Sequence, residues 1–315
     1  MANFGTTSAG ETVERITLAA GDLQVCLLTW GAVLQSVRLK GVDYDLTLGS
    51  ENIADYQGAM GYYGALVAPV VNRLTDARAK LGDGEIAVEV NFNGRHSLHS
   101  GPSGAQHHNW RIKSQSASAV VLELDLPDGL GGFPGNRHLE ARFEVSAPAS
   151  LRMTVTCESD AETLFNCANH SYWNLDGSGS LTGHQLQIAA EDYLPVNTDF
   201  VPTGEIRPVS GMFDFRKPQA ISPHKPDLDN CYCLSRAAGL LRDVLWLTGQ
   251  SGLRLTLATT EPGVQVYDCR HDGFKGLAIE AQGWPDAPNK PDFPPISLAA
   301  GATRTQVTEW RFDRG

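Results

Sequence analysis

The segment VVLELDLPDGLGGFPGNRHLEARFEVSAPASLRMTVTC, residues 120–157, decides the fold class of this chain. Apolar and polar residues alternate within it in three runs, 120–126, 139–145 and 151–157, which are separated by turns rich in glycine, proline and small residues. Alternation with a period of two places every second side chain on the same face, which is typical of a half-buried β-strand. The segment therefore predicts three consecutive strands joined by turns, and no helix.

The same alternation extends toward both ends of the chain. Only residues 51–63, ENIADYQGAMGYY, are expected to form a short helix or an ordered loop. Because no internal repeat and no linker divides the chain, we expect one all-β domain over residues 1–315, with two sheets packed face to face. Further strands are predicted at residues 23–27, 33–39, 185–188, 253–259, 264–268, 277–282 and 305–312.

The charge and the hydropathy of the chain exclude several classes of partner. The formal net charge is −11, whereas nucleic acids and anionic membranes bind basic surfaces, so neither is expected as a partner. Residues 1–18 lack a charged segment followed by an apolar run, and no apolar stretch approaches the ~20 residues of a membrane span. The sequence predicts a soluble, cytoplasmic protein and leaves monomer and homodimer open.

Neither the cysteines nor the histidines show the spacing of a metal site. The closest cysteines, Cys231 and Cys233, are separated by one residue, which fits neither a zinc site nor a CxxC redox motif. Four histidines between residues 96 and 108 lie in loops without carboxylates or cysteines at a supporting spacing. We therefore expect buried, reduced thiols and no metal.

Alternation within the strand predicted at residues 277–282, LAIEAQ, indicates a polar site. Leu277 and Ile279 are expected to face the core, which turns Glu280 and Gln282 toward the opposite face. A glutamate in the middle of an apolar strand is costly unless it has a function.

The strand predicted at residues 264–268 adds Gln265 and Tyr267 to the same face, and Trp284 follows shortly after the other strand. A polar cleft with an aromatic wall suits a carbohydrate, whose hydroxyls need hydrogen bonds and whose C–H faces pack on rings. The solvated face of an ordinary sheet has the same pattern, so alternation by itself leaves both interpretations open.

Two further stretches combine polar and apolar residues in a way that suits a site. NHSYWNL, residues 169–175, contains a titratable ring, a hydroxyl, two aromatic rings and two amides. Asn72 and Arg73 end the apolar run 65–73, where they are expected either to contact a ligand or to cap a strand in solvent.

With these residues in view, the chain resembles the aldose 1-epimerase (galactose mutarotase) family. The matching pieces occur in the family's order and extend from the first strands to Trp310. The resemblance implies a large antiparallel β-sandwich with an open cleft on one sheet, and the interconversion of the α and β anomers of a free aldose without cofactor or metal. The pieces are Asn72-Arg73, Leu98-His99, NHSYWNL (169–175), Leu228-Asp229-Asn230, PGVQVY (262–267) and IEAQGWPDAPN (279–289).

By this resemblance, Glu280 is the general base and His170 the general acid, facing each other across the sugar. Their reference pKa values of about 4.3 and 6.5 would let the carboxylate be basic while the imidazole holds a proton near neutrality. The resemblance also implies six residues that contact or position the sugar: Asn72, Arg73, His99, Tyr172, Asp229 and Gln265.

The chain departs from the family pattern at three places. Residues 68–71, Ala-Pro-Val-Val, stand where the family usually carries a Gly-Arg pair, and His99-Ser100-Gly101 replaces His-Gly-Gly. The segment 268–275, which is expected to border the cleft, is short. These departures are expected to affect the preference among hexoses, pentoses and extended sugars as substrates more than the type of reaction.

Three alternatives to a free-aldose epimerase involve the same residues. An epimerase of a phosphorylated hexose needs several cationic side chains near the cleft, and only Arg73 is evident. A non-catalytic carbohydrate-binding or sensing protein is expected to have lost the acid or the base. A glycoside hydrolase would pair Glu280 with Asp229, but then His170 has no role.

Overall fold

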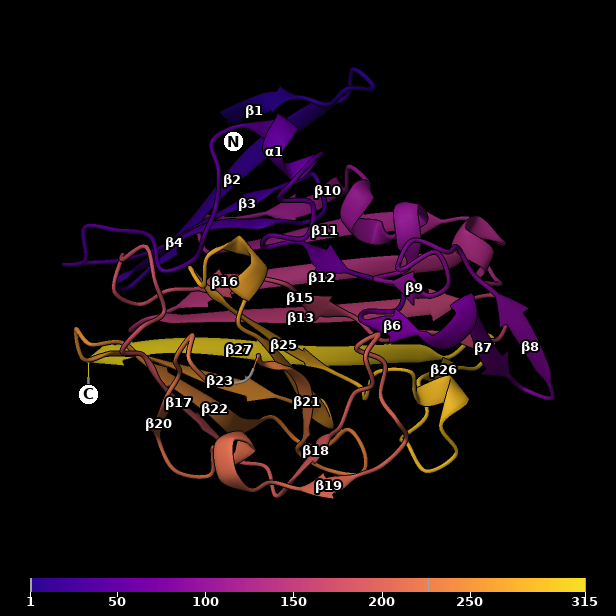
Figure 1. Cartoon of the computed structure of the whole chain (residues 1–315). Helices are drawn as coiled ribbons and strands as arrows, with labels where there is room; N and C mark the ends of the chain where they lie inside the picture. Colours follow the sequence, from indigo (N-terminus) through magenta and orange to yellow (C-terminus); the bar gives the residue numbers. More distant parts are fainter. Residues whose placement is uncertain (1, 226, 315) are drawn as a thin grey trace.

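Strands make up most of the regular structure in the computed structural model, which describes residues 2–225 and 227–314. The pairings between neighbouring strands of the three larger sheets are all antiparallel, so the prediction of an all-β, antiparallel fold is confirmed (Figure 1). Residues 1 and 315, the ends of the predicted single domain, lie outside the described residues, and the one-domain assignment stays a prediction.

The largest sheet has nine strands and contains the segment 120–157. The three predicted strands of this segment agree with the observed ones to within two residues at each end. The long C-terminal strand, yellow in Figure 1, joins the two halves of this sheet because it pairs on both sides. In spatial order the strands are β10 (Arg111–Gln115), β11 (Ala119–Leu126), β12 (Arg137–Ser146), β13 (Ser150–Ser159), β27 (Thr303–Arg314), β23 (Leu253–Thr259), β22 (Arg242–Thr248), β17 (Gln185–Ile188) and β20 (Gln219–Ala220).

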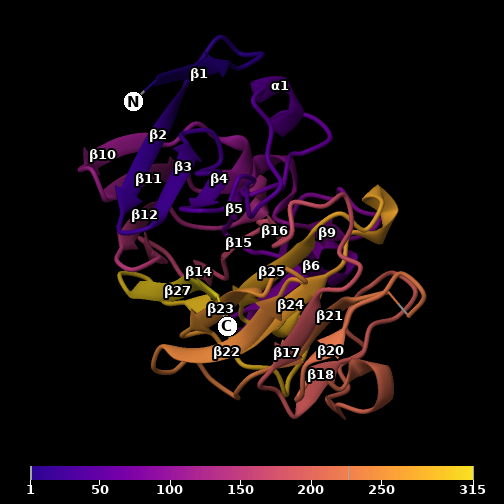
Figure 2. The same cartoon turned by 90° about the vertical axis from the view of Figure 1, so that its left-hand side faces the viewer.

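Two smaller sheets pack against the largest one. In Figure 2 the indigo four-stranded sheet lies beside the β10–β12 end, and the six-stranded sheet lies toward the β22–β17 end. The four-stranded sheet consists of β1 (Ala2–Thr6), β2 (Thr12–Ala20), β3 (Leu23–Leu28) and β4 (Leu34–Leu39). The six-stranded sheet, in spatial order, consists of β16 (Tyr172–Trp173), β25 (Leu277–Gln282), β24 (Gly263–Tyr267), β21 (Asp229–Cys233), β18 (Asp192–Leu194) and β19 (Arg207–Pro208).

The remaining strands form short pairs, and helices are few. The pairs are β5 (Leu66–Val67) with β15 (Ala168–Asn169), β6 (Arg73–Leu74) with β9 (Ser97–Leu98), β7 (Arg78–Leu81) with β8 (Gly84–Ala87), and β14 (Thr163–Leu164) with β26 (Ser297–Leu298). The predicted short helix is α1 (Ile53–Tyr56). In the part of the chain that the structure describes, seven 3₁₀ turns span Thr75–Ala77, Gly101–Ser103, Ala105–His107, Leu130–Gly132, Gly211–Phe213, Arg270–Asp272 and Ala287–Asn289. Within the described ranges, no helix is long and apolar enough to cross a lipid bilayer.

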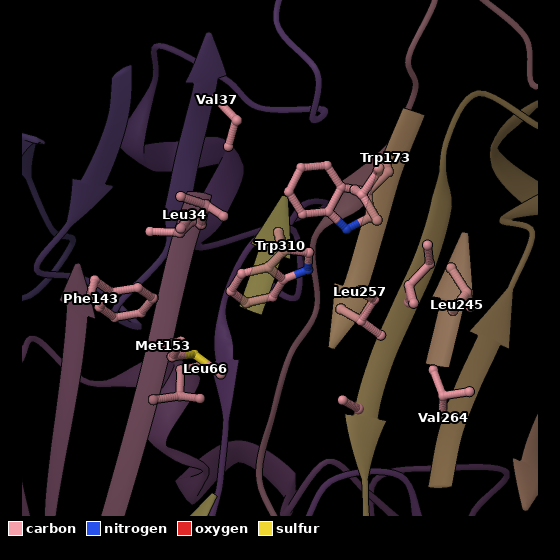
Figure 3. Close-up of a cluster of buried hydrophobic side chains, with 14 of the residues drawn as sticks. Leu34, Val37, Leu66, Phe143, Met153, Trp173, Leu245, Leu257, Val264 and Trp310 are labelled. Carbon is pink, nitrogen blue, oxygen red and sulfur yellow. The ribbon is translucent and has the colours of Figure 1, made fainter. Parts of the chain in front are cut away.

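One hydrophobic cluster connects the three larger sheets. The rings of Trp173 and Trp310 lie 6.0 Å apart within it, and both side chains are almost fully buried. Figure 3 shows them together with Leu34 and Val37 of β4, Phe143 and Met153 of the largest sheet, and Val264 of β24. Because apolar burial is the dominant favourable contribution to folding, this shared core fixes the smaller sheets against the larger one.

The sequence does not predict strands β21 and β22. Strand β21 begins with the polar residues Asp229 and Asn230, which look like part of a loop. Strand β22 contains the continuous apolar run Val244–Leu247, which lacks a period of two. Tertiary pairing with β24 and β23, respectively, makes both segments extended.

Candidate active site

A cleft of about 290 Å³ is lined by residues of the six-stranded sheet and of neighbouring loops. Seven of the eight site residues predicted from the sequence line this cleft, although they come from separate stretches of the chain. They are Asn72, Arg73, His99, His170, Tyr172, Asp229 and Glu280. The eighth, Gln265, is buried behind Asp229 and donates a hydrogen bond from Nε2 to Asp229 Oδ1 at 2.6 Å.

Strand β25 places Glu280 at the cleft. Leu277 and Ile279 belong to the core cluster, as predicted, and Glu280 lies on the other side of the strand. The alternative interpretation, a solvated face of an ordinary sheet, is wrong for this strand, because all six residues of β25 are buried. Gln282 is fully buried and does not line the cleft; its amide donates to the carbonyl of Gly283.

Trp284 is not the aromatic wall of the cleft, which corrects the prediction. Its side chain is fully buried against Phe293, in an edge-to-face contact of 5.1 Å, and its indole N–H donates to the carbonyl of Pro262. Two unpredicted rings, Phe92 and Phe200, line the cleft instead, together with Tyr62, Tyr172 and Tyr267. Single aromatic residues within polar loops, as in NFNG and NTDFVP, are the only signal that could have indicated the first two.

His170 faces Glu280 across a short gap at the cleft. The distance between His170 Nε2 and Glu280 Oε1 is 3.6 Å, and the two residues are 4% and 2% exposed. The backbone of His170 is fixed by two hydrogen bonds, from its N–H to Ala65 and from the N–H of Gly64 to its carbonyl. The side-chain amide of Asn169 donates to the carbonyl of Gly64. This amide therefore helps to hold the residue that binds the backbone of His170.

Burial shifts the pKa values of this pair in opposite directions. Loss of hydration raises the pKa of Glu280 to about 8, with the negative charge of Asp229 adding to the effect and Arg73 opposing it. Loss of hydration lowers the pKa of His170 to about 4, and the positive charge of Arg73 lowers it further. The order expected from the reference values is therefore reversed: between about pH 4 and 8 the empty cleft holds one proton, on the carboxyl group.

Arg73 and Asp229 form a part-buried ion pair beside the acid–base pair. Arg73 Nη2 lies 3.2 Å from Asp229 Oδ2, at the first residue of β21. The guanidinium also lies over the rings of Phe92 and Phe200, at 4.7 and 5.4 Å from their centroids. Such contacts hold the planar guanidinium in one orientation, so its remaining N–H groups are directed rather than mobile.

His99 is held as a hydrogen-bond donor. The backbone N–H of Asn72 donates to His99 Nδ1 at 3.1 Å, so in the neutral ring the proton is on Nε2. Burial and the nearby His170 and Arg73 keep the pKa of His99 well below its usual value, so the ring is neutral. An oriented Nε2–H group suits a hydroxyl acceptor.

The same hydrogen bond argues against a metal ion. His99, His170 and Glu280 bring ligand atoms within 4.8 Å of one another, a grouping that their positions in the sequence do not reveal. A metal needs the lone pair of His99 Nε2, but that nitrogen carries the proton as long as Nδ1 accepts from Asn72. The donor set therefore suits proton transfer and hydrogen bonding better than metal binding.

The cleft is lined by more carboxyl groups than cationic groups. Arg270 joins Arg73 as a second guanidinium at the cleft, which the sequence does not indicate. Arg270 pairs with Asp227 at 2.9 Å and also with Asp268, so both arginines are ion-paired. The carboxyl groups of Asp227, Asp229, Asp268 and Glu280 line the same cleft.

Comparison with known proteins gives one consistent family. The family model "Aldose 1-epimerase" matches residues 14–311. The chain is 32% identical to the galactose mutarotase of Mus musculus, over 97% of this chain and 95% of the relative. It is 30% identical to the aldose 1-epimerase of Escherichia coli (strain K12), over 96% of each chain.

Solved structures agree with this assignment. The fold is similar to that of an aldose epimerase homologue from C. elegans, with a TM-score of 0.89 and 27% identity over 96% of this chain and 99% of the other. It is also similar to galactose 1-epimerase from Lactobacillus acidophilus, with a TM-score of 0.88 and 26% identity over 100% and 98% of the two chains. From its sequence, its fold and the residues gathered at the cleft, this chain belongs to the aldose 1-epimerase family.

Proposed function

We propose that this protein interconverts the α and β anomers of a free aldose, with Glu280 and His170 as its acid–base pair. Membership of the aldose 1-epimerase family makes the protein an isomerase. The observation that carries the assignment of the two residues is their 3.6 Å separation in a buried position that opens to the cleft. Mutarotation needs one group that takes a proton and one that gives a proton, and this pair supplies both.

The proposed reaction moves one proton through the sugar. Glu280 removes the proton from the anomeric hydroxyl while His170 donates a proton to the ring oxygen, and the C1–O5 bond breaks to leave the free aldehyde. Rotation about the C1–C2 bond then presents the other face of the carbonyl. His170 takes the proton back from O5 as this oxygen attacks C1, and Glu280 returns its proton to O1.

The reversed pKa order fits this cycle. Ring opening starts from the carboxylate and the imidazolium and leaves the carboxyl group protonated and the imidazole neutral. Burial favours this second state in the empty cleft, and it is the state from which ring closure begins. Because a single proton serves both states, a turnover needs no net exchange with solvent.

The remaining cleft residues are proposed to hold the sugar during bond rotation. Arg73 and His99 offer N–H donors, and Asp229 and Asn72 offer oxygen acceptors, to hydroxyl groups of the substrate. Arg73 also stabilises negative charge that develops on the opening sugar. Tyr172 supplies an aromatic surface for C–H groups.

Removing the charge of Asp229 is expected to weaken substrate binding. For Asp229→Asn we expect KM to rise about 10- to 100-fold with a smaller change in kcat, because hydrogen bonds to charged groups contribute roughly 1.5–3 kcal/mol. Initial rates over a range of galactose concentrations measure this effect. Asp243→Asn is a matched control, because Asp243 pairs with Arg311 but does not line the cleft. A KM equal to that of the wild type would contradict the role of Asp229.

The charges at the cleft favour a neutral sugar over a phosphorylated one. Both guanidinium groups that line it already face carboxylates, so a phosphate dianion would meet uncompensated negative charge. We expect kcat/KM for galactose 6-phosphate to be on the order of 1,000-fold below that for galactose, since two charges about 4 Å apart near a protein surface interact by about 4 kcal/mol. NMR of the anomeric protons measures both rates, and equal rates would favour a phosphosugar epimerase.

Polarimetry tests the proposed function directly. Freshly dissolved α-D-glucose, α-D-galactose and α-D-xylose are expected to reach anomeric equilibrium faster with the protein than without it, and the rates rank the sugars. Calorimetric binding of these sugars without acceleration would support the carbohydrate-binding or sensing alternative instead. The six free cysteines agree with a reducing, cytoplasmic environment, which we also propose.

A further inference from the structure

The segment Asp268–Lys275 contacts Tyr63, which is distant in the sequence. The phenol of Tyr63 donates a hydrogen bond to Asp272 Oδ2 at 2.6 Å and contacts the sulfur of Cys269 at 3.6 Å. Tyr63 is 8% exposed, whereas the side chain of Asp272 is 57% exposed. The segment 268–275, the rim segment, thus places the exposed carboxylate of Asp272 next to the buried phenol of Tyr63.

Tyr63 connects this segment to the acid. Its ring stacks on Tyr172 at 4.1 Å and 27°, and the ring of Tyr172 lies 5.0 Å from the imidazole of His170. The residues next to Tyr63 bind the backbone of His170, because the N–H of Gly64 donates to its carbonyl and its N–H donates to Ala65. Ring contacts and backbone bonds from one short run therefore meet at the proposed acid.

The backbone packs closely next to both tyrosines of the stack. A Cβ added to Gly276 would lie 3.0 Å from the Cβ of Tyr172, so the chain that follows residues 268–275 passes close to the start of this side chain. A Cβ added to Gly64, which has a φ of +69°, would lie 2.3 Å from the carbonyl oxygen of Leu34. Gly276 thus confines Tyr172, and Gly64 confines the backbone next to Tyr63.

We propose that Tyr63 and Asp272 are positioning residues that set the orientation of the His170 imidazole toward Glu280. Asp272 fixes the phenol of Tyr63, the Tyr63 ring fixes Tyr172, and Tyr172 limits the tilt of the imidazole. Neither residue lines the cleft, so both act through Tyr172. The inference rests on the proposed function of His170, but the orientation of its ring is measurable without any activity.

The kinetic test uses Tyr63→Phe, Asp272→Ala and the double variant. We expect each single variant to lower kcat about 10-fold with KM within about 2-fold, since small errors in the placement of a catalytic group lower the rate strongly. The double variant is expected to be no slower than the slower single variant, because both changes break one hydrogen bond. Asp272→Asn retains an acceptor oxygen and is expected to restore kcat to near the wild-type value.

Tyr44→Phe is the matched control, because the phenol of Tyr44 donates to the carbonyl of Leu175 and Tyr44 does not line the cleft. It is expected to lower thermal stability at most and to leave kcat unchanged. The proposal is overturned if Tyr63→Phe and Asp272→Ala behave like this control, or if their effects on kcat multiply in the double variant.

A second readout separates this proposal from the proposed function. The ¹H–¹⁵N imidazole signals of His170, assigned with His170→Asn, are expected to move in Tyr63→Phe and Asp272→Ala but not in Tyr44→Phe. If the wild type did not catalyse mutarotation but these signals moved, the function would fail and the positioning role would stand. Unmoved signals would remove the positioning role whatever the activity.

Discussion

Replacing Glu280 with glutamine is expected to lower kcat by roughly 10²–10⁴-fold, the usual contribution of one general acid–base group. The amide has nearly the shape of the carboxyl group but cannot exchange a proton with the anomeric hydroxyl. Because burial keeps Glu280 mostly protonated at neutral pH, the neutral amide resembles the resting state, and KM is expected to change little. Polarimetry at saturating galactose measures the loss.

Three further variants make this result specific. His170→Asn is expected to lower kcat to a similar extent, and the double variant to be little slower than either, because the pair acts as one unit. Glu261→Gln is the matched control: Glu261 is 1% exposed and pairs with Arg304 but does not line the cleft. It is expected to retain the wild-type rate. A Glu280→Gln enzyme with wild-type kcat would refute the assignment of the base.

The loss of activity should not come from unfolding. The pKa of Glu280 in the folded protein, about 8, lies above the value of about 4.3 expected in the unfolded chain. The stability linked to this proton is therefore fully present below about pH 4.3 and is lost as the pH rises through 8. Glutamine carries no such proton, so at pH 8–9 the variant is expected to be at least as stable as the wild type in urea unfolding.

The rate is expected to depend on pH as a broad plateau with two limbs. Below about pH 4 both groups are protonated and no base remains, and above about pH 8 neither holds the proton and no acid remains. We expect kcat/KM to fall about 10-fold per pH unit outside this window, because only the one-proton state is active. Initial rates on galactose, corrected for the spontaneous reaction of the sugar, measure the profile.

The alkaline limb of the pH profile distinguishes the buried pair from a pair with the reference pKa values. A pair with ordinary pKa values would lose its last proton near pH 6.5, whereas the buried pair retains it to about pH 8. Circular dichroism at each pH checks that the protein remains folded. A decline in kcat/KM that begins at pH 6.5 would mean that burial does not control the pair in solution.

Much of the fold is readable from local pattern. Each of the ten strands predicted by alternation exists, because a period of two at residues such as Leu277 and Ile279 selects an extended chain with one face in the core. Strand β22 is missed because its apolar run does not alternate: Val244 and Leu245 are both buried at a register shift in the pairing with β23, and the half-buried Trp246 lines a mostly polar groove. Local pattern thus fails where a register shift interrupts the alternation of a strand.

The candidate site was also only partly predictable from the sequence. The motifs indicate seven of the residues that line the cleft, since proton transfer and hydroxyl recognition need particular side chains. They do not reveal that Trp284 is buried away from the cleft or that Phe92 and Phe200 enclose it, because loop aromatics are positioned by distant segments.

The sequence by itself determined the class of fold, the ten strands whose residues alternate and the residues that we propose as acid and base. Only the tertiary structure decided their charge states, the pairing of both arginines and the contact of Tyr63 with Asp272. The physical reason is that strand formation follows from the order of neighbouring side chains, whereas hydration, pKa and ion pairing depend on groups brought together from distant parts of the chain. Glu280 is an ordinary carboxylic acid in the sequence; burial beside Asp229 makes it one that holds its proton at neutral pH.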